Sequence, residues 1–143
     1  MKPTTKELEN KIDKAQSVDE LRKIISELPK DTFYDRLNEL MEKYGVCPAD
    51  IVRSTGMIKS LVYDITSARG KRKPQRYQIL KIAIAMRLTL EELNELLKLA
   101  NYKELYAKNA IDNVIRYGIQ NNLPDEEIEK LLMDASAPFS LFE

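Results

Sequence analysis

The feature that most constrains how this sequence folds is a series of helix-start signals, each followed by apolar residues at helical spacing. Side chains that can accept from the first free N–H groups of a helix precede such segments at Thr4, Ser17, Thr32, Thr89 and Asn109. After Ser17, in VDELRKIISEL, apolar residues recur at i, i+3, i+4 and i+7, which is the spacing of one helix face. No segment alternates apolar and polar residues with period two between turn residues. The sequence therefore predicts an all-α fold.

The predicted helices fall into three segments. Residues 1–30 are expected to form an N-terminal helical hairpin, residues 31–100 to form the central domain, and residues 101–143 to form a C-terminal helical extension. Within residues 31–100, the stretch RYQILKIAIAM is apolar almost all round. We therefore expect it to be the central buried helix.

Two short predicted helices lie on either side of STGM, where Gly56 allows the tight backbone of a turn. The first of them begins at Pro48, because proline suits the first position of a helix. The residues of this pair that we expect to face inward are Ile51, Val52, Ile58, Leu61, Val62 and Ile65. Burial of these residues lets the two helices pack at a steep angle, which is the pattern of a helix-turn-helix.

The residue inventory argues against an enzyme. The sequence has no histidine and no glycine-rich phosphate-binding motif, so the common nucleophile systems and nucleotide loops are absent. Cys47 is the one cysteine, cannot form an internal disulfide and is expected to fill a gap in the core, which fits a cytoplasmic protein. The longest uninterrupted apolar run, Ile82 to Met86, is far shorter than a membrane span. We expect no catalytic residue, no cofactor, no metal site and no membrane partner.

Positive charge is concentrated in one stretch, although the chain as a whole has a formal net charge of zero. Residues 57–82 carry seven cations and one anion, whereas residues 83–143 carry six cations and eleven anions. Neutrality is therefore a cancellation between a basic segment and an acidic C-terminal half. Such a separation steers a protein toward a polyanion when the acidic half faces away from it.

Four features occur in order along residues 34–100: GVCPADIVRSTG, then SLVYDI, then the basic turn GKRKPQR, and then a helix that leads into LTLEELNELL. With these features the chain resembles the lambda-repressor-like, XRE-type helix-turn-helix domain of bacterial regulators. The stretch NYKELYAKNAIDNVIRYGIQNNLPDEEIEKLLMD is similar to the C-terminal extension of one bacterial XRE subfamily. The resemblance implies that residues 31–100 form a DNA-binding domain whose helix 58–67 lies in the major groove.

The candidate DNA-binding residues form two groups. Carried over by position, the residues that the resemblance places in the groove are Lys59, Ser60, Tyr63 and Asp64, with Ser67 at the far end. The basic segment supplies the cations expected on the flanking phosphates, namely Arg69, Lys71, Arg72, Lys73 and Arg76. Lys59 would read guanine or bind phosphate, Ser60 would meet base or backbone, and Tyr63 would pack on a thymine methyl group.

Two residues depart from the family pattern. Ile58 stands where the family often has a Ser or Thr helix cap. Asp64 places a negative charge where the groove is strongly negative, so it needs a cytosine amino group, or Lys59 or Arg69 alongside.

The leading hypothesis is a sequence-specific, double-stranded DNA-binding transcription regulator. A homodimer is expected, since one groove helix reads few base pairs and two half-sites supply specificity. Either the acidic C-terminal helices or the N-terminal hairpin would provide the dimer surface. The alternative is a protein-interaction module or antitoxin-like protein that uses the helix-turn-helix as a scaffold and binds its partner through the acidic C-terminal half.

Overall fold

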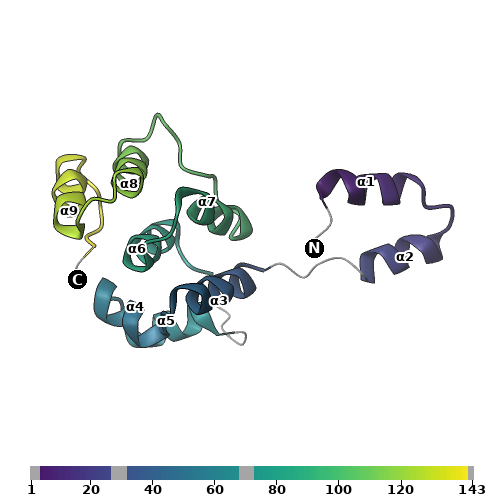
Figure 1. The fold of residues 1–143 in the computed structure, drawn as a ribbon, viewed down its shortest axis with the longest axis horizontal. Helices are drawn as coiled ribbons and strands as arrows, with labels where there is room; N and C mark the ends of the chain where they lie inside the picture. The colour runs from purple at the N-terminus through teal and green to yellow at the C-terminus, as the bar shows by residue number, and fades with distance from the viewer. Residues whose placement is uncertain (1–3, 27–31, 68–72, 142–143) are drawn as a thin grey trace. The chain divides into compact units, whose positions relative to one another are not determined.

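In the computed structural model, which describes residues 4–26, 32–67 and 73–141, all regular secondary structure is α-helical (Figure 1). The helices are α1 (Thr5–Asp13), α2 (Val18–Ser26), α3 (Phe33–Tyr44), α4 (Pro48–Thr55), α5 (Lys59–Thr66), α6 (Arg76–Met86), α7 (Leu90–Leu99), α8 (Ala110–Gln120) and α9 (Asp125–Asp134). The prediction of an all-α protein is thereby confirmed for the described residues. Within these ranges no helix has the length and apolar character needed to cross a membrane. Contacts between residues divide the chain into two units, Met1–Asp31 and Thr32–Glu143.

The N-terminal unit consists of α1 and α2, which contact each other. The predicted capping box at the start of α1 is present, because the Glu7 amide donates to Thr4 Oγ1 and the Thr4 amide donates to the Glu7 carboxylate. At the start of α2 the Glu20 amide donates to Ser17 Oγ at 3.1 Å. No residue from 4 to 25 is fully buried. This unit therefore has two well-capped helices but no closed core of its own.

The second unit is built around α6, which contacts α4, α7 and α8. Eight of its eleven residues are buried, including Ile79, Ile82 and Ala83. The expectation that RYQILKIAIAM forms the central buried helix is confirmed. α3, α7 and α8 each contribute an apolar stripe to the core, and in these stripes Leu37, Leu93 and Ile115 have no exposed surface.

The α4–turn–α5 segment contains the expected glycine turn. Gly56 has φ +68°, a left-handed conformation that glycine adopts at little cost, and its amide donates to the Val52 carbonyl at 2.9 Å. The buried Thr55 side chain joins α4 to the turn, since its Oγ1 donates to the Ile51 carbonyl and accepts from the Met57 amide. α4 contacts α6 and α5 contacts α3, so the helix pair is anchored to the core.

Ile58 does not face inward as the spacing predicted, because 71% of its surface is exposed. It precedes the first turn of α5 with extended backbone, φ −61° and ψ 132°, so its side chain leaves the inner stripe of the helix. Met57, only 5% exposed, fills the inward place from the turn. Of the remaining predicted inward residues of α5, Val62 and Ile65 are buried and Leu61 is partly buried.

Cys47 is also not a core residue, contrary to expectation, because it is exposed. It caps the N-terminus of α4, where its amide donates to Asp50 Oδ2 at 2.9 Å and its Sγ lies 3.2 Å from the same oxygen. The cap geometry directs this side chain along the helix end rather than into the interior.

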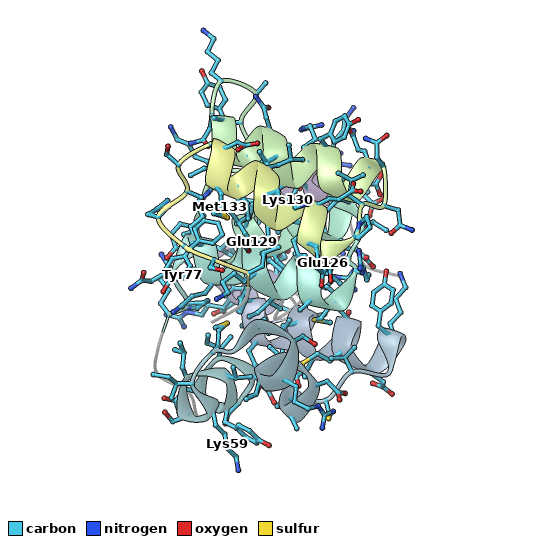
Figure 2. All side chains as sticks on the ribbon, turned by 90° about the vertical axis from the view of Figure 1, so that its left-hand side faces the viewer. Lys59, Tyr77, Glu126, Glu129, Lys130 and Met133 are labelled. Carbon is cyan, nitrogen blue, oxygen red and sulfur yellow. The ribbon has the colours of Figure 1, made fainter. Side chains whose placement is uncertain are left out.

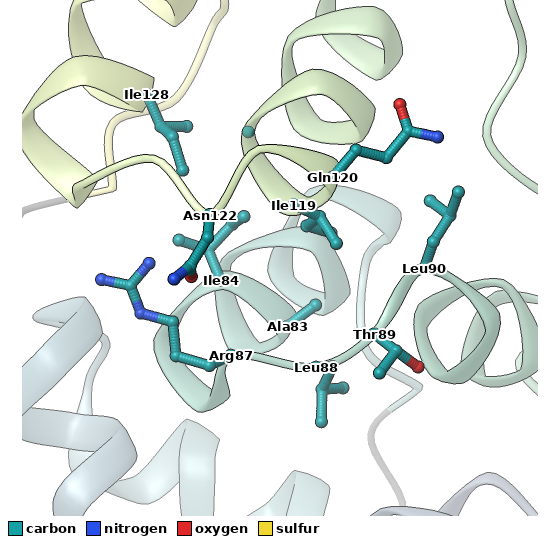
Figure 3. Close-up of a pocket in the computed structure, with 11 residues that line it drawn as sticks. Ala83, Ile84, Arg87, Leu88, Thr89, Leu90, Ile119, Gln120, Asn122 and Ile128 are labelled. Atoms are coloured by element: carbon teal, nitrogen blue, oxygen red, sulfur yellow. The ribbon is translucent and has the colours of Figure 1, made fainter.

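The C-terminal helices α8 and α9 contact each other, and α8 also contacts α6 and α7. A cavity of about 320 Å³ lies where they meet the α6–α7 turn, with mostly apolar walls that include Ile84, Leu90 and Ile119 (Figure 3). Its charged side chain, Arg87, donates to the Leu123 carbonyl at 3.0 Å and pairs with Asp125 at 3.1 Å. Arg87 therefore fastens the C-terminal pair to the end of α6.

Candidate nucleic-acid interface

The outer face of α5 carries the residues expected in the groove. Lys59, Ser60 and Ser67 are exposed, and 43% of the Tyr63 surface is exposed. Asp64 is half-buried at the edge of this face. The inner face of the same helix is closed by Val62, Ile65 and Thr66. We call Ile58, Lys59, Ser60, Tyr63, Asp64 and Ser67 together the α5 surface.

Lys59 lies over the Tyr63 ring, with Nζ 5.6 Å from the ring centroid. The two residues are one helical turn apart, so the contact fits the i, i+4 geometry of neighbouring side chains. An exposed cation–π contact of this kind stabilises by about 0.5–1 kcal/mol, which limits the rotamers of both side chains. The ammonium group projects away from the body of the unit (Figure 2).

The N-termini of α5 and α6 differ from those of the other described helices. Every other described helix has an acidic residue in its first turn, whereas α5 and α6 have none. An acidic residue there neutralises the positive end of the helix dipole. The α5 N-terminus therefore keeps its positive potential, as a site for phosphate groups requires, whereas the Asp112 carboxylate lies against the first residue of α6.

Of the five cations of the basic segment, the structure describes Lys73 and Arg76. Arg69, Lys71 and Arg72 lie outside the described residues. Lys73 is exposed, and its Nζ lies 4.5 Å from the centroid of the Tyr102 ring. The Tyr102 hydroxyl donates to the Pro74 carbonyl at 2.7 Å, so the ring that supports Lys73 is itself fixed.

Arg76 has a different environment from the one expected of a phosphate contact. Its guanidinium forms two hydrogen bonds of 2.8 Å to the carboxylate of Asp112, which is 2% exposed. It also donates to the carbonyls of Lys103 and Glu104. The guanidinium therefore neutralises a buried carboxylate within the protein, and we leave Arg76 out of the proposed DNA contacts. Sequence spacing gave no signal for this pair, because its two residues are separated by 36 positions.

Cations of α3 are likewise bound to acidic groups of α7. Arg36 donates to Glu95, and Lys43 Nζ lies 2.8 Å from Glu92. Glu92 is 6% exposed, and burial alone raises the pKa of its carboxyl group. Donation from Lys43, the Thr89 amide and the Tyr44 hydroxyl outweighs burial and lowers the Glu92 pKa to about 2. This network joins α3 to α7, and α3 also contacts α5.

The acidic helix α9 lies away from the α5 surface. In Figure 2 Lys59 projects from one end of the unit, whereas the α9 residues Glu126, Lys130 and Met133 lie toward the other end. Lys59 and α9 are thus separated in space as well as in sequence. Among the described residues, no group of His, Cys, Asp or Glu side chains has the arrangement of a metal site.

Ile58 is the member of the α5 surface that sequence reasoning did not assign to it. The available signal was its position directly after the Gly56 turn, where a residue precedes the helix and does not share its inner stripe. Comparisons with family models, curated proteins and solved structures find no match for this chain.

Proposed function

We propose that this protein binds double-stranded DNA sequence-specifically, as a transcription regulator that inserts α5 into the major groove. The observation that carries the proposal is the α5 surface. It combines an exposed lysine, an exposed hydroxyl and an exposed tyrosine on a helix whose first turn holds no acidic residue. The resemblance of residues 34–100 to XRE-type domains supports the same function.

The proposed contacts divide by chemistry. Lys59 and Ser60 stand at the start of α5, where side chains of a groove helix reach base edges. Tyr63 presents an aromatic edge one turn further along, which suits a thymine methyl group. Lys73 and the neighbouring residues Arg69, Lys71 and Arg72 supply charge for the phosphates that border the groove.

The electrostatic separation supports this orientation. A duplex that approaches the α5 surface meets Lys59, while α9 lies toward the other end of the unit (Figure 2). The Arg36 and Lys43 side chains do not add to the attraction, because each is paired with a carboxylate of α7.

Fluorescence anisotropy of a labelled random duplex tests the proposal. Engagement of roughly five to ten phosphates predicts that log affinity falls with log salt at a slope of about −4 to −9. Lys59→Ala should then weaken binding by about 1–3 kcal/mol at a site selected from random sequence, if the lysine reads a base. If it contacts only phosphate, the variant should instead reduce the slope by about 1 for all sequences.

Lys130→Ala is the matched control, because Lys130 is an exposed lysine on α9 far from the α5 surface (Figure 2). It should leave both the affinity and the slope unchanged. Equal losses from Lys59→Ala and Lys130→Ala, or a flat salt response at micromolar protein, would exclude groove binding through α5.

A second candidate function rests on the surface formed by α8 and α9. A groove of about 650 Å³ between these helices is lined in part by Val114, Tyr117 and Leu131, and 56% of the Tyr117 surface is exposed. Glu127 and Asp134 lie on the same groove, so the partner it favours is a protein segment with apolar and basic residues. Lys59→Ala combined with Arg72→Ala discriminates the two functions, since it should abolish DNA binding and leave such a partner bound.

A further inference from the structure

The N-terminal hairpin has an apolar surface that its own two helices do not cover. On α2, 65% of Val18 and 57% of Ile25 are exposed, and on α1, 47% of Ile12 is exposed. Val18 and Ile25 are seven residues apart and therefore lie on the same face of α2, two turns from each other. A unit of about this size, below roughly 40 residues, is usually stabilised by a partner, a disulfide or a metal. Two nine-residue helices are also too short to be stable by themselves.

The charges of α2 indicate which partner covers this face. Its first turn holds Asp19 and Glu20, and the following turn holds Arg22 and Lys23. The helix is thus acidic at its N-terminal end and basic toward its C-terminal end, so it is complementary to a second α2 in antiparallel orientation. Residues 4–26 carry five cations and five anions, so the hairpin as a whole has no net charge to favour DNA or an acidic or basic protein.

From this pattern we propose that the N-terminal hairpin binds the hairpin of a second copy of the chain, with α2 against α2 in antiparallel orientation. A twofold axis near Leu21 and Arg22 places Val18 of one copy beside Ile25 of the other. The two apolar residues then cover each other twice in one isologous interface. Asp19 and Arg22 lie on one flank of this contact, and the axis brings Asp19 of each copy beside Arg22 of the other. The interface is independent of the α5 surface and would bring two groove helices into one assembly.

Sedimentation equilibrium of the full-length chain over a series of concentrations tests the interface. The wild-type chain should show a concentration-dependent monomer–dimer equilibrium. Ile25→Asp should abolish the dimer because it places a charge in the apolar centre of the contact. Met133→Asp is the control, since Met133 is 70% exposed on α9 and lies outside the hairpin. Circular dichroism should show that both variants keep the helices of the second unit.

Charge reversal provides a test that misfolding cannot imitate. The Arg22 and Asp19 side chains are 77% and 93% exposed, neither caps a helix, and within one chain they approach each other only to 4.0 Å, so their substitution leaves packing intact. Asp19→Arg alone and Arg22→Asp alone each place like charges opposite each other twice and should weaken their own dimers about tenfold. Mixed together, the two variants should form a heterodimer, because every flank pair is again of opposite sign.

A wild-type chain that stays monomeric at all concentrations would overturn the proposal. So would a dimer that survives Ile25→Asp but is lost with Met133→Asp, which would place the interface on α9. Failure of the mixed variants to associate better than either alone would reject the antiparallel arrangement. The outcomes for the two proposals can be told apart. A monomeric protein that binds a single DNA half-site would support the proposed function and reject the hairpin interface. A hairpin dimer that does not bind DNA would support the interface and reject the proposed function.

Discussion

Arg76 and Asp112 form a two-point ion pair, with both guanidinium–carboxylate distances at 2.8 Å, that joins the first residue of α6 to the first turn of α8. The Asp112 carboxylate also accepts from the Tyr106 amide at 2.9 Å. A buried carboxylate is tolerated only when its charge and lone pairs are satisfied, and these donors do so. The pair therefore determines where the C-terminal segment meets the central helix.

Removal of the arginine should be strongly destabilising. Arg76→Met leaves the Asp112 charge buried without its partner, which we expect to lower the free energy of unfolding by about 3 kcal/mol in urea denaturation. Lys73→Met is the control, since Lys73 is an exposed lysine nearby whose loss removes only its contact with the Tyr102 ring and should change stability by less than about 1 kcal/mol. Equal stability of the two variants would show that the ion pair does not hold α6 to α8.

The Glu92 network predicts a loss of stability in acid. The folded-state pKa of Glu92, about 2, lies below its usual value of 4.5, so the carboxylate stabilises the fold fully above the usual pKa. That contribution, about 3 kcal/mol, should be lost as the pH falls from about 4.5 toward 2. Thermal unfolding as a function of pH measures it. In Glu92→Gln the stability at neutral pH should fall and the acid dependence should become shallower, whereas Glu91→Gln, an exposed neighbour, should retain the wild-type profile.

Gly118 is required by close packing between α8 and α9. A Cβ atom at this position would lie 2.8 Å from both Cγ1 and Cδ1 of Ile128, which is 1% exposed and has little room to move. Glycine to alanine inside a helix ordinarily stabilises by about 1 kcal/mol, but here we expect Gly118→Ala to destabilise by about 1–3 kcal/mol. Ile128→Ala in the same chain should relieve the clash, so the double variant should lose less than the sum of the two single variants. Strict additivity in urea denaturation would contradict this account.

Met57 and Ile58 are adjacent apolar residues with opposite environments. Met57→Ala should lower the free energy of unfolding by about 2–5 kcal/mol because it empties a buried site. Ile58→Ala should change it by less than about 0.5 kcal/mol, since the side chain is exposed. Because Ile58 belongs to the α5 surface, Ile58→Ala should nevertheless weaken DNA binding. A large loss of stability in Ile58→Ala would place this side chain in the core instead.

Local signals in the sequence were sufficient for the helices. Thr4, Thr32 and Thr89 each precede an observed helix and accept its amide at the third helical position, because capping depends on residues three apart. The all-round apolar pattern of α6 likewise predicted its burial, since a helix with no polar face has no side to expose.

Features that depend on the exact start of a helix, or on a partner far away in the sequence, could not be predicted from local sequence patterns. Periodicity assigned Ile58 to the inner stripe, but α5 begins one residue later and Met57 enters the core from the turn. Hydrophobicity assigned Cys47 to the interior, although its backbone position as a helix cap turns it outward. The partner of Arg76 comes from another helix, and no local pattern identifies it.

The central position of α6 determines where the chain can be cut. This helix contacts α4 and also α8 in the C-terminal segment. In addition, the Tyr102 hydroxyl, from the loop after α7, donates to the Pro74 carbonyl just before α6. A fragment that ends after Leu99 would lose the carboxylate bound to Arg76 and uncover the flank of α6 that α8 shields. The C-terminal helix α8 is thus part of the scaffold around α6, and we expect a self-sufficient piece of this unit to include it.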